Sequence, residues 1–203
     1  MRSSNAGHTL LCGIAGDQRA ARIAETLMRP NSFSGWGIRT IPSSEARYNP
    51  ISYHNGSVWP HDNAIIAMGF ARYGHTERLH RVLDGLFEAA SFIDLYRLPE
   101  LFCGFPRRER IGPTLYPVAC NPQAWASAAV LGLLGACLGI AFDAKNKQVR
   151  LHHPSLPGAL NELHLHGLRL GDAEIDLLFR RHVNDVAINV TRRTAGVEVI
   201  ISS

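Results

Sequence analysis

The spacing of apolar residues changes once along this chain, and that change limits the folds that the chain can adopt. Up to about residue 140 apolar residues recur every three or four positions, and over roughly the last sixty residues they recur at every second position. The first period is typical of amphipathic helices and the second of strands that bury one face. The sequence therefore predicts a mainly helical domain over residues 1–143 and a small antiparallel β domain over residues 144–203.

Capping residues and turn residues indicate where these elements begin and end. Pro60 suits the first turn of a helix that stops near Gly74, and Asn121 and Pro122 suit the start of a later one. The expected helices are Asp17–Met28, Pro60–Gly74, Thr76–Phe92 and Pro122–Leu138, with a further core helix opening at Leu10 to Cys12. The expected strands contain the pairs Leu163/Leu165, Leu168/Leu170, Ile175/Leu177, Val186/Ile188 and Val197/Val199. A charged turn from Asp143 to Gln148 is the expected domain boundary.

Composition and charge exclude several classes of protein. With 46% hydrophobic and 19% charged residues and no run of 18 apolar residues, the chain is expected to be neither disordered nor an integral membrane protein. The net charge is +4, but Glu109 interrupts the densest basic cluster, so nucleic acid is not an expected partner. The four cysteines contain no CxxC pair and predict reduced thiols in the cytoplasm. The histidines near the C-terminus lack a ligand set, so no metal or other cofactor is expected.

The segment Tyr53–Asp62 combines aromatic, imidazole, amide and carboxylate side chains within ten residues. A buried core does not need this mixture, whereas a sugar site does, because aromatic faces cover the C–H side of the ring and polar groups bind its hydroxyls. The segment lies in a long loop over residues 33–60, and a second long loop, over residues 98–122, carries Glu100. Loops of this length are usually functional or disordered, and these are too aromatic for disorder.

Seven side chains are candidates for sugar binding, and several have a structural alternative. They are Trp36, Tyr53, His54, Asn55, Trp59, Asp62 and Gln123. The aromatic candidates could equally pack in the core of a helical domain. Asp62 lies two residues after Pro60 and could instead stabilise a helix N-terminus. Trp125 is expected in the core.

Several segments together resemble the C-terminal half of glycoside hydrolases of the glycogen-debranching, or amylo-α-1,6-glucosidase, type. The segments are Ser4–His8, Phe33–Thr40, Tyr48–Asp62, Leu98–Phe102 and Cys120–Trp125. Their order and spacing match that family as well as their residues do, and they span most of residues 4–125. The resemblance implies a partial (α/α)6 toroid of helical hairpins, whose connecting loops form a funnel for carbohydrate, followed by the small β domain.

The resemblance also implies catalytic roles. Glu100 occupies the position of the glutamate that acts as general base of an inverting reaction in such families, although a solvated loop glutamate is the alternative. The general acid of these families is an aspartate on an earlier loop, in a half of the toroid that would precede this chain. Asp62 is the acidic residue within the main motif, as a catalytic group, a sugar ligand or a helix-start residue. The predicted helices are too few for six hairpins, so the chain is expected to be a fragment or to assemble with the N-terminal half.

Three functions from different classes follow. The first is an amylo-α-1,6-glucosidase-type glycoside hydrolase that acts on an α-glucan or related oligosaccharide and takes its general acid from elsewhere. The second is a carbohydrate-binding remnant or module without chemistry. The third is a sugar phosphorylase or epimerase on the same toroid, for which Arg107, Arg108 and Arg110 are the candidate phosphate ligands.

Overall fold

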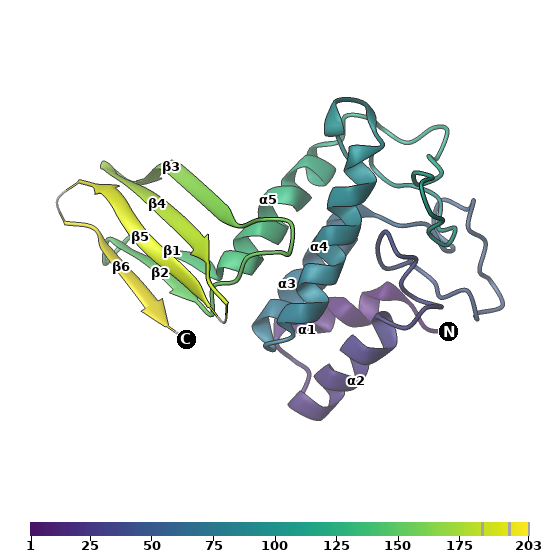
Figure 1. Cartoon of the computed structure of the whole chain (residues 1–203). Helices are drawn as coiled ribbons and strands as arrows, with labels where there is room; N and C mark the ends of the chain where they lie inside the picture. Colours follow the sequence, from purple (N-terminus) through teal and green to yellow (C-terminus); the bar gives the residue numbers. More distant parts are fainter. Residues whose placement is uncertain (184, 195, 203) are drawn as a thin grey trace. The chain divides into compact units, whose positions relative to one another are not determined.

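The chain forms two compact units in a computed structural model that describes residues 1–183, 185–194 and 196–202. The first unit is Met1–Leu134 and the second is Gly135–Ser203. Figure 1 shows the helices of the first and the strands of the second. The division therefore falls before the charged turn at Asp143 that the sequence suggested. The reason is that the strand ending at this turn pairs within the β unit.

The helices of the first unit follow the predicted positions closely. They are η1 (Ser4–Gly7), α1 (His8–Cys12), α2 (Asp17–Leu27), α3 (Pro60–Arg72), α4 (Thr76–Ser91), η2 (Asp94–Tyr96) and α5 (Ala124–Leu138), which continues past residue 134. The predictions for α2, α3 and α4 are confirmed to within two residues. Helix α5 begins later than predicted, because the carbonyl of Gln123 accepts the first intrahelical hydrogen bond, from Ser127. Gln123, rather than Asn121, is thus the cap residue.

Helix α1 crosses α3 at close range, and this crossing places the first residues of both helices together. A Cβ atom on Gly69 would lie 2.6 Å from the Cβ of Leu10 and 2.8 Å from the main-chain nitrogen of Leu11, so only glycine fits there. Leu10, Ile66 and Phe70 are fully buried around this contact. Because the crossing is fixed, His8 at the start of α1 reaches Asp62 in the first turn of α3.

Isolated β-bridges tie the long loops of the helical unit to one another. Arg39 pairs with Val58, Val58 with Phe102, and Phe102 with Leu115, all antiparallel. Val58 and Phe102 exchange two main-chain hydrogen bonds, of 2.9 and 3.0 Å. The short ladder brings the segment that contains Tyr53–Trp59 alongside the segment that contains Glu100, although they lie far apart in sequence.

Two buried polar side chains fasten these loops. Arg39 is 2% exposed, and its guanidinium donates to the carbonyl oxygens of Gly104, Pro30 and Asn31 at 2.6, 3.2 and 3.2 Å. Asn63 is fully buried; it accepts from the Ile38 amide at 2.6 Å and donates to the Ile38 carbonyl at 3.0 Å. Buried main-chain groups need such partners, so these two side chains take the place of regular secondary structure.

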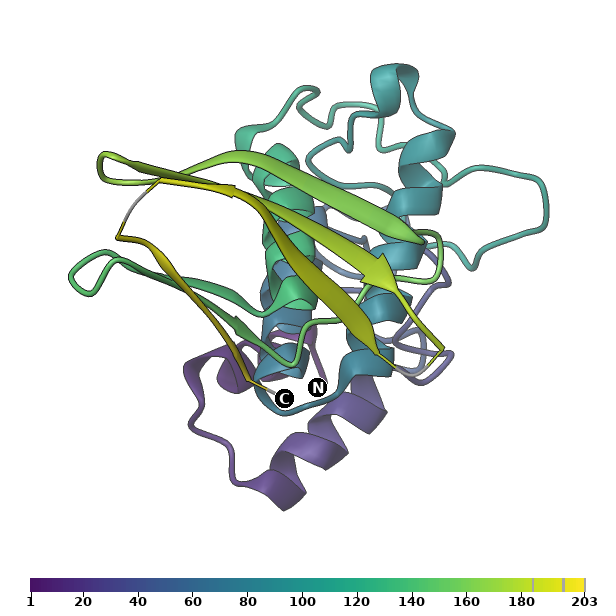
Figure 2. The ribbon, with the colours of Figure 1, turned by 60° about the vertical axis from the view of Figure 1, so that its left-hand side comes forward.

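The second unit contains two three-stranded sheets. One holds β1 (Ile140–Asp143), β2 (Gln148–His152) and β6 (Glu198–Ser202) in the order β1-β2-β6, and the other holds β3 (Glu162–Leu170), β4 (Ala173–Arg181) and β5 (Val186–Arg193) in the order β3-β4-β5. Figure 2 shows the two sheets of this unit as two layers. The prediction of a small antiparallel β domain is confirmed for the pairings β1–β2, β3–β4 and β4–β5, whereas β2 and β6 pair in parallel. Val149, Leu151, Ile175, Leu177 and Phe179 are buried in this unit.

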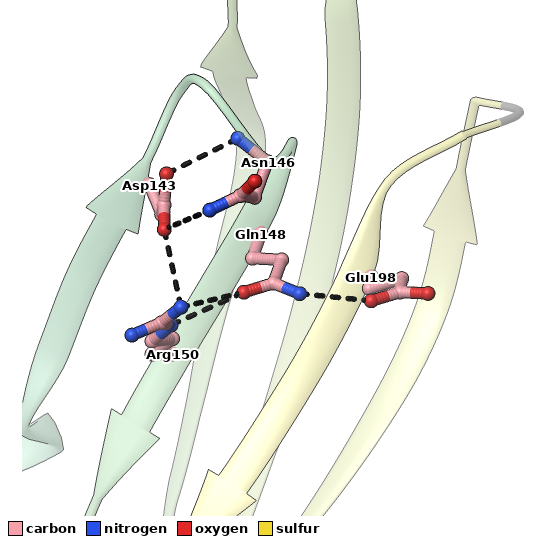
Figure 3. A network of polar contacts seen from close by, with 5 residues as sticks. All are labelled: Asp143, Asn146, Gln148, Arg150 and Glu198. Carbon is pink, nitrogen blue, oxygen red and sulfur yellow. Dashed lines mark hydrogen bonds and ion pairs between the residues drawn. The ribbon is translucent and has the colours of Figure 1, made fainter.

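The charged stretch from Asp143 to Gln148 is the turn of the β1–β2 hairpin, and a polar network organises it (Figure 3). Asp143 accepts from the main-chain and side-chain nitrogens of Asn146 at 3.1 and 2.8 Å, and Arg150 donates to it at 3.1 Å. The Asn146 side chain is the largest cause of the lowered pKa of Asp143. Gln148 accepts from Arg150 and donates to Glu198 on β6 at 3.0 Å, so the network spans all three strands.

The architecture is therefore mixed: five α-helices precede two small sheets over the residues that the structure describes. A helix of sufficient length and hydrophobicity to cross a membrane is not found in this part of the chain.

Candidate active site

A cleft of about 570 Å³ opens in the helical unit where the N-terminal segment, the loop before α3 and the start of α5 converge. Its lining residues include Asn5, His8, Thr40, Tyr53, His54, Asn55, Trp59, His61, Asp62 and Trp125. The volume lies within the range of roughly 300–1,000 Å³ that is usual for small-molecule sites. The combination of aromatic rings with amide, imidazole and carboxylate groups, expected from residues 53–62, is thus present along one wall.

Aromatic rings form a continuous cluster along this wall. Tyr53 meets Trp59 edge to face with ring centroids 4.8 Å apart, and Trp59 meets Trp125 in the same manner at 6.3 Å. The His61 ring stacks on Trp125 at 4.4 Å. Trp125 is 44% exposed, so the expectation that it packs in the core is wrong. Its exposed face can cover the C–H face of a sugar ring.

Glu100 lies beside this cluster and is held by neighbouring donors. It is 6% exposed; the Tyr53 hydroxyl donates to Oε1 at 2.7 Å and the Cys120 amide to Oε2 at 3.2 Å. The Glu100 amide in turn donates to the Cys120 carbonyl at 2.9 Å. The hydrogen bond from Tyr53 is the largest cause of the lowered pKa of Glu100, and Cys120 and Gln123 lower it further while burial opposes them. The carboxyl is therefore ionised at neutral pH.

The bond to Glu100 changes the ionisation of Tyr53 as well. Because its hydroxyl donates to a carboxylate, ionisation of the phenol would place two negative charges together, and the pKa of Tyr53 rises to about 12. Tyr53 thus remains a protonated donor throughout the physiological range.

A second carboxylate, Asp62, lies within the cleft as part of a pair. Its Oδ1 is 2.5 Å from Nε2 of His8, while its buried Oδ2 has no hydrogen-bond partner among the described residues. The bond to Asp62 raises the pKa of His8, whereas burial lowers the pKa of the adjacent His61. The charges of Asp62 and Glu100 oppose this lowering of the His61 pKa.

The structure brings most of the predicted site residues together and leaves one apart. Tyr53, His54, Asn55, Trp59 and Asp62 line the cleft. Gln123 interacts with the Glu100 carboxylate and does not line the cleft. Trp36 is 2% exposed; it packs against Phe92 at 5.9 Å, with the guanidinium of Arg107 4.6 Å from its ring. Its surroundings are those of a core tryptophan, and it does not line the cleft.

His8, His61 and Tyr116 also lie at the site, although the sequence did not single them out. His8 and His61 lie in segments that carried the family resemblance, so the resemblance contained a signal for them. Tyr116, whose ring is 5.6 Å from that of Tyr53, lies in the second long loop without a distinguishing pattern. A group of three or more histidine, cysteine or acidic side chains arranged to hold a metal ion does not occur among the residues with described positions.

Part of this chain is similar to known proteins, and the similar part includes residues that line the cleft. Residues 2–95 match the profile of the mannosylglycerate hydrolase MGH1-like glycoside hydrolase domain. Mannosylglycerate hydrolase MGH1 from Selaginella moellendorffii is 29% identical over 79 residues, which are 39% of this chain and 16% of that protein. The chain therefore spans only a small part of this curated relative. The profile match includes His8 and Tyr53–Asp62 and ends before Glu100.

These similarities support a glycoside hydrolase-like domain in the N-terminal part of the chain. They do not single out the amylo-α-1,6-glucosidase type. The resemblance seen in the sequence is therefore supported at the level of glycoside hydrolases, and the debranching specificity is not.

Proposed function

We propose that this chain is the base-bearing part of a glycoside hydrolase, with Glu100 as the general base. The observation that carries the proposal is a buried glutamate that is ionised at neutral pH and bonded to an aromatic residue of a sugar-type cleft. The similarity of residues 2–95 to a glycoside hydrolase domain independently supports the glycoside hydrolase part of the proposal.

The protonation state of Glu100 suits a base rather than an acid. Glycosidases use one carboxylic acid to protonate the leaving oxygen and one carboxylate to activate water or to attack the anomeric carbon. A general acid needs a raised pKa so that it still holds its proton at neutral pH. The lowered pKa of Glu100 supports the carboxylate role that we propose for it, and its hydrogen-bond donors favour that state.

The described lining of this cleft does not offer a free carboxylic acid that could act as the proton donor. Asp62 is the acidic residue along the cleft lining, and it is engaged with His8. We therefore propose that a further helical segment, corresponding to the remaining hairpins of an (α/α)6 toroid, supplies the general acid. That segment is the partner expected from the sequence, and the small share of the relative's length that this chain covers supports it.

The substrate is a glycoside whose terminal sugar fits an aromatic-lined cleft of about 570 Å³. The amylo-α-1,6-glucosidase activity suggested by the sequence is one form of this proposal, with an α-glucan as substrate. The relative's name indicates another, with mannosylglycerate as substrate. A cytoplasmic location belongs to the same proposal and is supported by the four widely spaced cysteines, which contain no CxxC pair.

The test compares the chain with its Glu100→Gln variant on a panel that contains branched α-1,6-glucan, linear α-1,4-oligosaccharide and mannosylglycerate. Each assay is run with and without the proposed partner segment, and with and without phosphate. Removal of a general base is expected to lower turnover by about 100- to 10,000-fold. Glu109→Gln, in the exposed part of the same loop, is the matched control and should retain full activity. Unchanged turnover by Glu100→Gln would exclude the assignment.

A second candidate function is sugar binding without hydrolysis, which the engaged state of Asp62 favours. In that case the sugars would change the fluorescence of Trp59 and Trp125 without releasing product, even when the partner segment is present. Product formation in any arm of the panel would exclude this alternative.

A further inference from the structure

Tyr53 was expected to be a platform for a sugar ring, but its contacts describe a different role. Three other rings pack against it: His54 at 4.6 Å, Trp59 at 4.8 Å and Tyr116 at 5.6 Å, all edge to face. A ring surrounded in this way has little free face on which a pyranose could stack. Its hydroxyl, however, is directed at one oxygen of Glu100.

We infer that Tyr53 is a positioning residue, whose hydroxyl and the Cys120 amide together hold the Glu100 carboxylate in one orientation. This inference rests on the proposed function, since it assigns Tyr53 to the activation of the base rather than to sugar binding.

The two donors bind different oxygens, and this arrangement fixes the plane of the carboxylate. Tyr53 bonds Oε1 at 2.7 Å and Cys120 bonds Oε2 at 3.2 Å. The side chains of Cys120 and Gln123 also interact with this carboxylate. The bond from Tyr53 is short and charge-assisted, whereas the bond from Cys120 is long and comes from the main chain. Tyr53 is therefore the stronger of the two restraints and the one that a side-chain substitution can remove.

The ring cluster keeps this hydroxyl in place. Because neighbouring rings contact Tyr53 on several sides, its side chain is restrained before any ligand binds. The main chain of Tyr53 is restrained too, since its carbonyl accepts from the Ser57 hydroxyl at 2.6 Å and from the Trp59 indole at 3.2 Å. Preorganised donors of this kind contribute to catalysis because they need no rearrangement during the reaction.

Tyr53 is not itself the base in this arrangement. Its pKa of about 12 keeps the phenol protonated wherever the cleft would operate, so it donates to Glu100 and does not remove a proton from water. The predicted signature of Tyr53→Phe is thus a rise in the pKa of Glu100 together with a fall in kcat, with KM little changed.

The test uses Tyr53→Phe, which retains the ring and its packing and removes only the hydroxyl. Tyr73→Phe is the matched control, because the Tyr73 hydroxyl also makes a short bond, of 2.6 Å, but to the Ala15 carbonyl. From the usual strength of a hydrogen bond to a charged group, kcat in Tyr53→Phe should fall about 10- to 100-fold. The acidic limb of its pH–rate profile should move to higher pH, and Tyr73→Phe should leave both properties unchanged.

A second measurement needs no catalysis. The titration of Glu100 is followed by ¹³C NMR in protein labelled at the glutamate carboxyl, with the resonance assigned through Glu100→Gln. Its midpoint should rise in Tyr53→Phe, and the ionisation midpoint of Tyr53, read from tyrosinate absorbance, should fall below about 12 in Glu100→Gln. If both midpoints stay unchanged, the inference is overturned whatever the activity. If both move but no glycoside is hydrolysed under any condition, the coupling stands and the proposed function fails.

Discussion

Asn63→Ala should destabilise the loops around the cleft by more than the removal of one small side chain suggests. In the described structure the Ile38 amide and carbonyl both rely on the Asn63 side chain, with bonds of 2.6 and 3.0 Å. The third bond, from the Asn63 side chain to the Trp59 carbonyl at 3.0 Å, is less critical. That carbonyl also accepts from the main-chain N–H of Asn63, which the substitution retains. The substitution thus leaves two buried main-chain groups without partners.

The expected loss follows from that count. Each buried polar group left unsatisfied costs about 1–3 kcal/mol, so the free energy of unfolding of the helical unit should fall by about 2–6 kcal/mol. With a urea dependence of about 2 kcal/mol per molar, the unfolding midpoint should fall by about 1–3 M. Such a loss is a large part of the roughly 5–15 kcal/mol that stabilises a typical domain.

Tryptophan fluorescence is the suitable assay, because the three tryptophans, at positions 36, 59 and 125, all lie in the helical unit. Urea unfolding followed by this signal therefore reports on that unit. Asn31→Ala is the control, since Asn31 makes an exposed side-chain bond to Ser44 and its loss should change the midpoint little. A loss below about 1 kcal/mol in Asn63→Ala would show that the loop relaxes to satisfy Ile38 and would refute the reasoning.

Two further predictions concern the start of the helical unit. Gly69→Ala should destabilise this unit by about 1–3 kcal/mol, because the new methyl group would overlap Leu10 at the crossing of α1 and α3, whereas Gly16→Ala, with open space around it, should be nearly neutral in the same urea assay. Asp62→Asn should lower the pKa of His8 toward its ordinary value, as measured by ¹H NMR. Because the pKa of His8 is raised in the folded chain, the pair stabilises the fold fully below the unfolded-state pKa of His8. This stabilisation is lost as the pH rises through the folded-state pKa. An unchanged His8 pKa in Asp62→Asn would contradict the pairing.

The helices were predictable because local signals agreed with one another. In α3 and α4 the apolar period, the Pro60 start and the glycine that follows Tyr73 all indicated the same bounds. The sheets were less predictable. Strands β1 and β2, of four and five residues, flank the charged turn and were not predicted. The parallel pairing of β2 with β6 joins residues about fifty positions apart, and no local pattern specifies it.

The candidate site shows the same contrast. The chemistry of Tyr53–Asp62 could be predicted because the relevant side chains are contiguous in sequence. The partners of those side chains could not, because they are distant: His8 meets Asp62 across 54 positions, and Glu100 meets Tyr53 across 47. Residue type alone also could not separate core tryptophans from site tryptophans. Trp36 is buried, whereas Trp125 faces the cleft.

The buried guanidinium of Arg39 has a consequence for protein engineering. It joins carbonyls from two loops, at Asn31 and Gly104, and the Tyr48 hydroxyl donates to the same Gly104 oxygen at 2.9 Å. The shape of the sugar-type motif is thus imposed from outside the motif. A peptide of residues 53–62, or a graft of that segment onto a foreign scaffold, would keep the residues and lose their arrangement. The smallest transplantable version of this site has to include both long loops and the arginine that joins them.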